Sequence, residues 1–211
     1  MTICLQLDHV NYSYGAAKIR VLSDVNADFE SGKMYAITGP SGAGKSTLLS
    51  LLAGLDAPSD GVVRFEGEDI ATTAYSKHRR EHVSLVFQDH NLIDYLTPEE
   101  NLRLVNPKAD MKILEDLGLS REESKRNIMH LSGGQRQRVA VGRALVAPGR
   151  AILADEPTGS LDPEMTDEVI NLLRHAAHQL GKCVIVVTHS KRVADSADAV
   201  YTLRHKKLAK A

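Results

Sequence analysis

Residues 39–47 carry the strongest chemical signal in the sequence, because their types and spacing suit a loop that binds phosphate groups. They match the pattern G-x-x-x-x-G-K-[ST]. In chain order they are Gly39, Pro40, Ser41, Gly42, Ala43, Gly44, Lys45, Ser46 and Thr47. The glycines let successive backbone N–H groups point into one concavity, Lys45 can reach the β- and γ-phosphates, and Ser46 can ligate Mg²⁺. We therefore expect this chain to bind a nucleoside triphosphate with Mg²⁺.

The segments on both sides of this loop match the context that it needs. Residues 34–38 are short, apolar and β-favouring, which predicts a buried strand, and residues 48–53 predict a helix. The N-terminus of that helix adds partial positive charge next to the loop. The alternative is a glycine-rich turn with an incidental lysine, and the correct flanks argue against it.

A pair of acidic residues follows the apolar segment at residues 151–154. Asp155, at the end of such a strand, suits Mg²⁺ opposite the loop hydroxyl of Ser46. The adjacent Glu156 has the chemistry of a general base for a water that attacks the γ-phosphate. These residues predict hydrolysis of the triphosphate.

Two further polar residues stand at the ends of predicted strands. Gln88 follows residues 83–87, and His189 follows the buried strand at residues 184–187. Ligands gather at the carboxyl ends of strands in open α/β sheets, so Gln88 is placed to meet the metal or the attacking water. His189 is placed to bond a γ-phosphate. Taken alone, each is only a polar residue at a strand end, and a lone histidine is more often structural.

A second glycine-containing segment precedes a helical pattern near the middle of the chain. It consists of Leu131, Ser132, Gly133, Gly134 and Gln135. Ser132 suits a helix N-cap, and the glycines leave backbone N–H groups exposed at the helix start, which predicts a second anion site. An ordinary glycine-rich helix entry is the alternative for this segment taken alone.

Two tyrosines, Tyr12 and Tyr14, lie one residue apart in a chain with few aromatic residues and no tryptophan. One of them suits the core, and the other suits stacking on a nucleotide base, since stacking on an aromatic ring tolerates many bases. The pattern is weak by itself, since tyrosines are common in edge strands.

The composition restricts the classes of protein that fit. The 211 residues carry a formal net charge of −1, which gives no general reason to expect nucleic acid or an anionic membrane surface as a partner. The sequence lacks a run of about 18 apolar residues, and its N-terminus lacks the pattern of a signal peptide. Cys4 and Cys183 occur in apolar, strand-like segments and are expected to be buried free thiols.

The pattern of elements predicts an α/β domain with a helical insertion. Residues 89–130 lack strand patterns, and helices are expected after Thr97, near residues 111–117 and after Ser120. We also expect residues 72–80 to form a solvated face and residues 204–210 to form a frayed end. Val169, Leu172, Leu173, Ala176 and Leu180 recur at helical spacing and are expected in the core.

Taken together, these residues resemble the nucleotide-binding subunit of ATP-binding cassette (ABC) transporters over essentially the whole chain. Residues 131–135 resemble the family's signature motif, which is far more specific than the phosphate loop. The other matching motifs are the adenine-stacking aromatic at Tyr14, the Q-loop at Gln88, the Walker B pair at Asp155 and Glu156, the D-loop at Ser160, Leu161 and Asp162, and the switch histidine at His189. The resemblance implies one domain over residues 1–211 with the P-loop NTPase fold. That fold has a RecA-like, mainly parallel core sheet, an N-terminal antiparallel β subdomain and a helical subdomain at about residues 89–131.

By the same resemblance, the working unit is two cassettes placed head to tail, with ATP between the phosphate loop of one and the signature of the other. Gln88, Ser46 and Asp155 would hold Mg²⁺. The partners would be a separate integral-membrane permease and a second cassette, expected to be identical, with no nucleic acid. The chain would lie in the cytoplasm on the inner face of the membrane, with residues 89–131 as the docking surface.

Within the family, residues 87–101 and 154–159 are most similar to the lipoprotein-releasing, macrolide-exporting, antimicrobial-peptide-resistance and cell-division ATPases. The insertion at residues 101–131 is shorter than in that subgroup, and no regulatory domain is expected after the last strand. A cell-division type of mechanical regulator is the first alternative to a transporter. A soluble cassette ATPase ranks last, because the sequence lacks a basic excess and a metal-ligand cluster. The sequence does not indicate the cargo.

Overall fold

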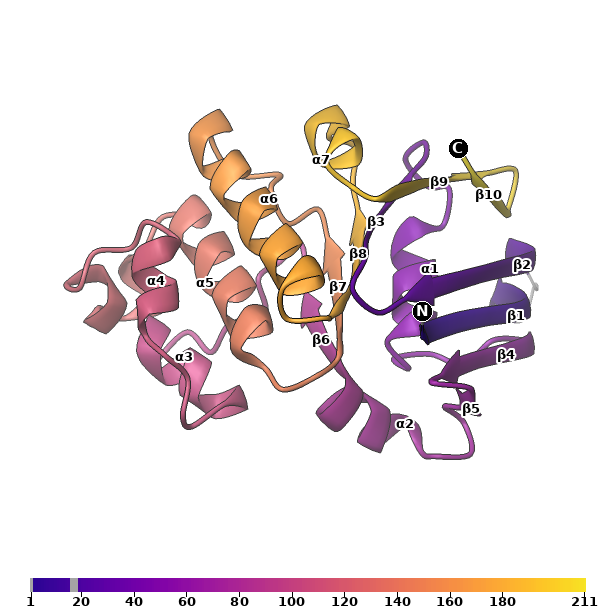
Figure 1. The fold of residues 1–211 in the computed structure, drawn as a ribbon, viewed down its shortest axis with the longest axis horizontal. Helices are drawn as coiled ribbons and strands as arrows, with labels where there is room; N and C mark the ends of the chain where they lie inside the picture. The colour runs from indigo at the N-terminus through magenta and orange to yellow at the C-terminus, as the bar shows by residue number, and fades with distance from the viewer. Residues whose placement is uncertain (1, 16–18) are drawn as a thin grey trace.

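The computed structural model describes residues 2–15 and 19–211, which form two sheets with helices packed between and beside them (Figure 1). Met1 and residues 16–18 lie outside the described residues. The domain predicted over residues 1–211 includes all four of them, and the N-terminal segment examined for a signal peptide includes Met1. The strands are β1 (Ile3–Tyr14), β2 (Ile19–Glu30), β3 (Met34–Thr38), β4 (Asp60–Phe65), β5 (Glu68–Asp69), β6 (Val83–Val86), β7 (Ala151–Asp155), β8 (Cys183–Val187), β9 (Ala199–Arg204) and β10 (Lys207–Lys210). The α-helices are α1 (Lys45–Leu52), α2 (Tyr75–Lys77), α3 (Pro98–Val105), α4 (Lys112–Asp116), α5 (Gly133–Val146), α6 (Pro163–His178) and α7 (Lys191–Asp195).

The larger sheet has the strand order β10-β9-β3-β8-β7-β6, and all its neighbours are parallel except β10 and β9. The central strands are buried because helices cover both faces. On one face, Ile37, Leu153 and Ile185 pack in the same apolar cluster as α1. On the other face, Ile152 and Val184 pack in the cluster that contains α5 and α6. The predicted α/β architecture with a mainly parallel sheet is confirmed.

The smaller sheet has the order β2-β1-β4-β5 and is antiparallel throughout. Leu5 and Phe29 on its inner side are fully buried and share a cluster with Leu48 and Leu51 of α1. Helix α1 therefore lies between the two sheets, and the end of β1 reaches the N-terminal end of this helix at the contact of Tyr14 with Thr47. This arrangement places Tyr14 beside the phosphate loop.

The segment between β6 and α5 contains helices and no strand among its described residues, as predicted. Helix α3 begins at the expected Thr97 cap, where the Thr97 hydroxyl and the Glu100 carboxylate form a reciprocal capping box. Ser120 and Glu123 form the same pair of bonds, but only a single 3₁₀ turn, Glu123–Lys125, follows. The predicted third helix is wrong because the backbone becomes extended at Arg126.

Two local predictions are wrong because tertiary contacts decide them, and a third fails at one residue. The last residues do not fray, because β10 pairs with β9 from Lys207 to Lys210. Residues 72–80 are largely exposed, as predicted, but His78 is fully buried and bonds Leu52. Leu180 is 57% exposed, because α6 ends at His178 and the chain turns away from the core.

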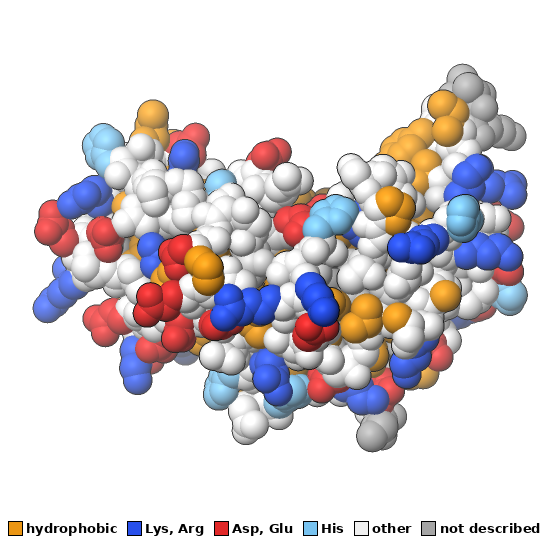
Figure 2. All heavy atoms as spheres, turned by 90° about the horizontal axis from the view of Figure 1, so that it is seen from above, with side chains coloured by type: hydrophobic (Ala, Val, Ile, Leu, Met, Phe, Trp, Pro, Cys, Tyr) orange, Lys and Arg blue, Asp and Glu red, His pale blue; other side chains and the backbone are white. Residues whose placement is uncertain are grey.

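The prediction for the two cysteines is confirmed, since Cys4 and Cys183 are buried free thiols. Among residues 2–15 and 19–211, no helix is both long enough and apolar enough to cross a bilayer. Lysine and arginine side chains are interspersed with aspartate and glutamate over the face in Figure 2, which fits the near-zero net charge.

Candidate nucleotide-binding site

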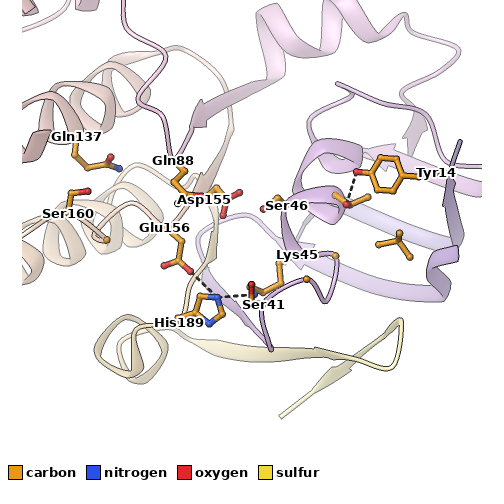
Figure 3. Close-up of a pocket in the computed structure, with 15 residues that line it drawn as sticks. Tyr14, Ser41, Lys45, Ser46, Gln88, Gln137, Asp155, Glu156, Ser160 and His189 are labelled. Carbon is orange, nitrogen blue, oxygen red and sulfur yellow. Dashed lines mark hydrogen bonds and ion pairs between the residues drawn. The ribbon is translucent and has the colours of Figure 1, made fainter. Parts of the chain in front are cut away.

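A cavity of about 590 Å³ lies at the carboxyl ends of β7 and β8, beside the N-terminus of α1 (Figure 3). Its lining contains most of the residues that the sequence singled out. They are Tyr14, Ser41, Gly42, Gly44, Lys45, Ser46, Thr47, Gln88, Asp155, Glu156, Ser160 and His189. Gly39, Pro40 and Ala43 belong to the same loop but do not line the cavity. Its volume is in the range of small-molecule sites.

The phosphate loop needs glycine at two positions where another residue would not fit. Gly39 has φ 150°, and a β-carbon there would lie 2.4 Å from the carbonyl oxygen of Leu203. Gly44 has φ 100°, and a β-carbon there would lie 2.6 Å from a methyl group of Val21. Gly44 is also the N-cap of α1 and offers no side chain to it, so the first N–H groups of the helix have no side-chain partner. An anion can use these donors.

Lys45 is 7% exposed and folds back over the loop. Its Nζ donates to the carbonyl oxygens of Gly39 at 2.9 Å and Pro40 at 3.0 Å, and it lies 3.2 Å from Nε2 of His189. The ammonium is therefore held at the cavity wall by two backbone carbonyls, with no carboxylate among these partners. Such a group can turn toward a phosphate without breaking an ion pair.

Glu156 lies at the end of β7 with a positive φ of 48°, which is uncommon for a residue with a side chain. Its backbone N–H donates to the carbonyl of Val187 at 2.9 Å, and its Oε2 accepts from the Thr188 hydroxyl at 3.2 Å. Its Oε1 is buried, has no hydrogen-bond partner within the described residues and lies 3.7 Å from Nε2 of His189. One carboxylate oxygen is therefore held in place while the other is free to accept a proton.

Ser46, Gln88 and Asp155 bring oxygen atoms to the same cavity from α1, the segment after β6 and the end of β7. Hydroxyl, amide and carboxylate oxygens are ligands that suit Mg²⁺, which also keeps waters and takes phosphate oxygens from its substrate. The described residues contain no group of three or more His, Cys, Asp or Glu side chains placed to hold a metal. These three residues therefore fit a metal that the substrate's phosphates help to hold.

Tyr14 is half exposed, and Tyr12 beside it is buried. The two rings meet edge to face, with centroids 4.9 Å apart. The Tyr12 hydroxyl donates to Asp56, which raises the pKa of Tyr12 to about 12, and the Tyr14 hydroxyl bonds the Thr47 hydroxyl at 2.9 Å. These contacts fix the Tyr14 ring next to the phosphate loop with its surface open to an aromatic base.

The signature residues 131–135 do not line this cavity. The Ser132 hydroxyl accepts from the Gln135 N–H at 3.2 Å, and the Gln135 side chain accepts from the Ser132 N–H at 2.8 Å. Gln135 also donates to Glu123 at 2.5 Å. In the predicted D-loop, Ser160 lines the cavity, whereas Asp162 accepts from Met165 as the N-cap of α6. The signature is thus a capped helix start, apart from the phosphate loop.

Four residues at the site were not assigned a role from the sequence, and one of them is Gly159, which lines the cavity beside Ser160. Val21 lines the cavity from β2, and nothing in the sequence pattern indicates this. Thr188 is fully buried and holds Glu156. Gln137 also lines the cavity. Its position three residues after Gly134 puts it on the same face of α5, which is the signal that would have found it.

The fold and site define the class of P-loop nucleoside triphosphatases, with a phosphate loop between a strand and a helix and acidic residues at the end of a neighbouring strand. A family model described as ABC transporter matches residues 22–159, which is more than half of the chain. The chain belongs to the ABC transporter family, and within it the chain is an ATP-binding cassette with ATPase activity.

Relatives of this chain include two kinds of protein. The chain is 37% identical to the uncharacterized ABC transporter ATP-binding protein YclH of Bacillus subtilis, over 92% of this chain and 90% of YclH. It is 39% identical to the macrolide export ATP-binding/permease protein MacB of Escherichia coli, over 97% of this chain. The chain spans only 34% of the length of MacB.

Solved structures give the same result for the fold. The dimeric structure of MJ0796, a bacterial ABC transporter cassette, matches with a TM-score of 0.90 and 33% identity over 98% of both chains. The dimeric post-hydrolysis state of MJ0796 bound to ADP and Pi matches with a TM-score of 0.89. The predicted P-loop NTPase fold and the resemblance to this family are confirmed.

Proposed function

We propose that this chain is the ATP-hydrolysing subunit that drives a separate membrane permease, and that two copies close over ATP to do so. The observation that carries this proposal is that the signature lies outside the cavity that contains the phosphate loop. A second copy placed head to tail brings Ser132, Gly133 and Gly134 of one chain to the nucleotide of the other. The dimeric structures of MJ0796, one of them with ADP and Pi bound, support a dimer of cassettes.

In this proposal the phosphate loop and the N-terminus of α1 bind the triphosphate, and Tyr14 stacks on the base. Lys45 leaves the carbonyls of Gly39 and Pro40 and bonds the β- and γ-phosphates. Ser46, Gln88 and Asp155 hold Mg²⁺, which supplies charge neutralisation at the phosphates. The D-loop residues Ser160, Leu161 and Asp162 lie at the contact with the second copy.

Glu156 is the proposed general base of the hydrolysis. Its unpartnered Oε1 accepts the proton of a water whose oxygen bonds the γ-phosphorus, while the bond from that phosphorus to the bridging oxygen breaks and ADP leaves with the electron pair. Thr188 keeps the carboxylate in place through its bond to Oε2. His189, which stands 3.7 Å from Oε1, bonds the γ-phosphate.

The membrane partner is proposed to dock in a groove of about 360 Å³ between β6, α3 and α5. Its lining combines apolar side chains with three arginines, Arg79, Arg80 and Arg143. Leu104 and Val105 of α3 line the groove and are 55% and 38% exposed. A short permease helix with apolar and acidic side chains fits this lining. MacB is named as an ATP-binding/permease protein, so its name places both functions in one chain. Here the permease would be a second chain. The cassette would lie on the inner face of the membrane.

The direct test compares wild-type protein with Glu156→Gln, using Glu168→Gln on the exposed face of α6 as the control. Loss of general base catalysis is expected to lower the ATP turnover by roughly 10²- to 10⁴-fold. ATP affinity is expected to stay near the wild-type value, because the phosphate loop is intact. Unchanged turnover in Glu156→Gln would remove Glu156 from the mechanism.

The permease is tested with the same variant, tagged and purified with ATP from detergent-solubilised cells of its source. A polytopic membrane protein in stoichiometric yield, identified by mass spectrometry, supports the proposal. Recovery of soluble proteins or nucleic acid in its place contradicts the proposal.

A further inference from the structure

Gln137, in the second turn of α5, has an unusual environment for a polar side chain. It is 1% exposed, and its Nε2 is buried without a hydrogen-bond partner within residues 2–15 and 19–211. A buried amide that lacks a partner lowers the stability of a protein. Each such group in a native structure calls for an explanation, and a role in catalysis is one of them.

The surroundings of Gln137 show which groups lie near its amide. Gly134, three residues earlier on the same helix face, packs so closely on the D-loop that a β-carbon there would lie 3.3 Å from the carbonyl oxygen of Ser160. Gln137 lines the nucleotide cavity together with Ser160, Gln88 and Asp155. Figure 3 shows its carboxamide extending from α5 toward Gln88, with Ser160 beside it.

Gln88 offers a complementary group. It lies two residues after β6 and lines the cavity, and its side chain makes no hydrogen bond to any described residue of the chain. Its carbonyl oxygen has two lone pairs, so it can accept one hydrogen bond and still turn its other lone pair toward the bound substrate. The Nε2 of Gln137 can only donate, so an oxygen atom is the partner that it needs.

We propose that Gln137 is a positioning residue for ATP hydrolysis, whose amide donates to the Gln88 carbonyl oxygen once ATP fills the cavity. This inference rests on the proposed function of the site. Because α5 begins with the signature, the bond links the helix that meets the partner's nucleotide to the Gln88 of the chain's own site. Through Gln137, closure of the ATP site on the partner chain is coupled to the position of Gln88 in the chain's own ATP site.

The test replaces Gln137 with methionine, which has a similar shape and no amide. The control is Gln179→Met, at the exposed end of α6. Loss of the outer partner of a ligating side chain is expected to lower kcat about 10-fold. KM and the affinity for ATP are expected to stay within about twofold of wild type, because direct contacts to ATP are retained. The Tm is expected to equal or exceed that of wild type, because an unpaired buried amide is removed.

A double-mutant cycle tests whether Gln137 acts through Gln88. In a Gln88→Ala background, adding Gln137→Met is expected to leave kcat unchanged, since the group that it positions is absent. An unchanged kcat in the single variant overturns the inference. So does a fall in kcat that comes with a lower Tm and is repeated in full in the Gln88→Ala background, because it shows a structural role.

This experiment separates the failure of the inference from the failure of the proposed function. If the wild-type protein hydrolyses ATP and Gln137→Met is equally active, only the inference fails. If the wild-type protein does not hydrolyse ATP, the proposed function itself fails, and the inference fails with it.

Discussion

Helices α1 and α5 both have glycine at or next to their first residue, but the backbone N–H groups at their N-termini have different partners. The N-cap of α1 is Gly44, which gives no side-chain bond, and the cavity opens in front of it. At α5, Ser132 and Gln135 bond each other's backbone N–H groups, and no atom lies within 4 Å of a β-carbon placed on Gly133. One N-terminus is left open inside a cavity of the same chain, and the other is stabilised at the surface.

The C-terminal ends of the two helices are alike. The carbonyl of Leu52 in α1 bonds Nε2 of His78 at 3.0 Å. At the end of α5, Asn106 donates to Val146 at 2.9 Å, and Lys182 donates to Ala147 at 2.7 Å. Both helices are therefore anchored by side chains at their C-terminal ends. The difference between the N-termini fits the proposed function, in which α1 binds phosphate within one chain and α5 meets the nucleotide of a second copy.

The largest effect is expected from Gly134→Asp in the signature. A carboxylate at this position adds negative charge where α5 would meet a phosphate, and its β-carbon would crowd Ser160 at 3.3 Å. Turnover is expected to fall at least about 100-fold, the scale for loss of one aligned donor to a developing charge. Binding of ATP by the single chain is expected to be unchanged. If this variant loses ATP binding as strongly as turnover, α1 and α5 contact the same ATP within one chain.

The next largest effect is expected from Lys45→Ala at α1. Hydrogen bonds to charged groups contribute about 1.5–3 kcal/mol, so the affinity for ATP is expected to fall roughly 10- to 100-fold. Equilibrium binding of a fluorescent ATP analogue measures this change, with the exposed Lys77→Ala as the control. Wild-type affinity in Lys45→Ala would mean that the loop does not bind the phosphates.

A smaller effect is expected from Ser132→Ala, which removes the cap of α5. Loss of an N-cap costs about 1 kcal/mol, which lowers the Tm of a chain of this size by about 2–4 °C. Thr97→Ala is the matched control, because Thr97 forms the same capping box on α3 away from the cavity. Both variants are expected to lose similar stability, and only Ser132→Ala is expected also to lose turnover. Equal turnover in the two variants would mean that Ser132 stabilises α5 but does not take part in ATP hydrolysis.

The smallest effect concerns His78, which holds the end of α1. Burial lowers the pKa of His78 from its ordinary value of 6.5, and the nearby His82 and Arg79 act in the same direction. Below about pH 6.5 the unfolded chain therefore takes up a proton more readily than the folded protein, so this residue makes stability fall as the pH decreases. His78→Gln keeps an N–H donor but does not titrate, and we expect it to show a smaller loss of Tm between about pH 7.5 and 5.5. The exposed His175→Gln is the control, and an equal loss in both variants would contradict this interpretation.

Much of the fold was predictable because its signals are local. The buried strands read as short apolar runs, and Thr97 marks its helix through a capping box that needs only four residues. The placement of Asp155, Glu156 and His189 in one cavity follows from the general rule that the ends of parallel strands meet at one sheet edge.

Other features depend on contacts that the sequence does not display. Strand β10 forms because its backbone pairs with the edge strand β9. His78 is buried because its ring packs against Phe65 and bonds the Leu52 carbonyl. The open Oε1 of Glu156 depends on a bond from Thr188, which stands 32 positions away. The burial of Gln137 likewise results from how α5 packs on the D-loop, which no short motif describes.

In the proposed function, one chain holds only part of the ATP site and a second copy completes it. Light scattering on Glu156→Gln with and without ATP measures this directly, because this variant is expected to keep its bound ATP. We expect the mass of one chain, 23.0 kDa, without ATP and twice that mass with ATP. Adding Gly134→Asp is expected to restore the single-chain mass while ATP stays bound. A mass of 23.0 kDa for Glu156→Gln at saturating ATP would mean that a second copy does not complete the site.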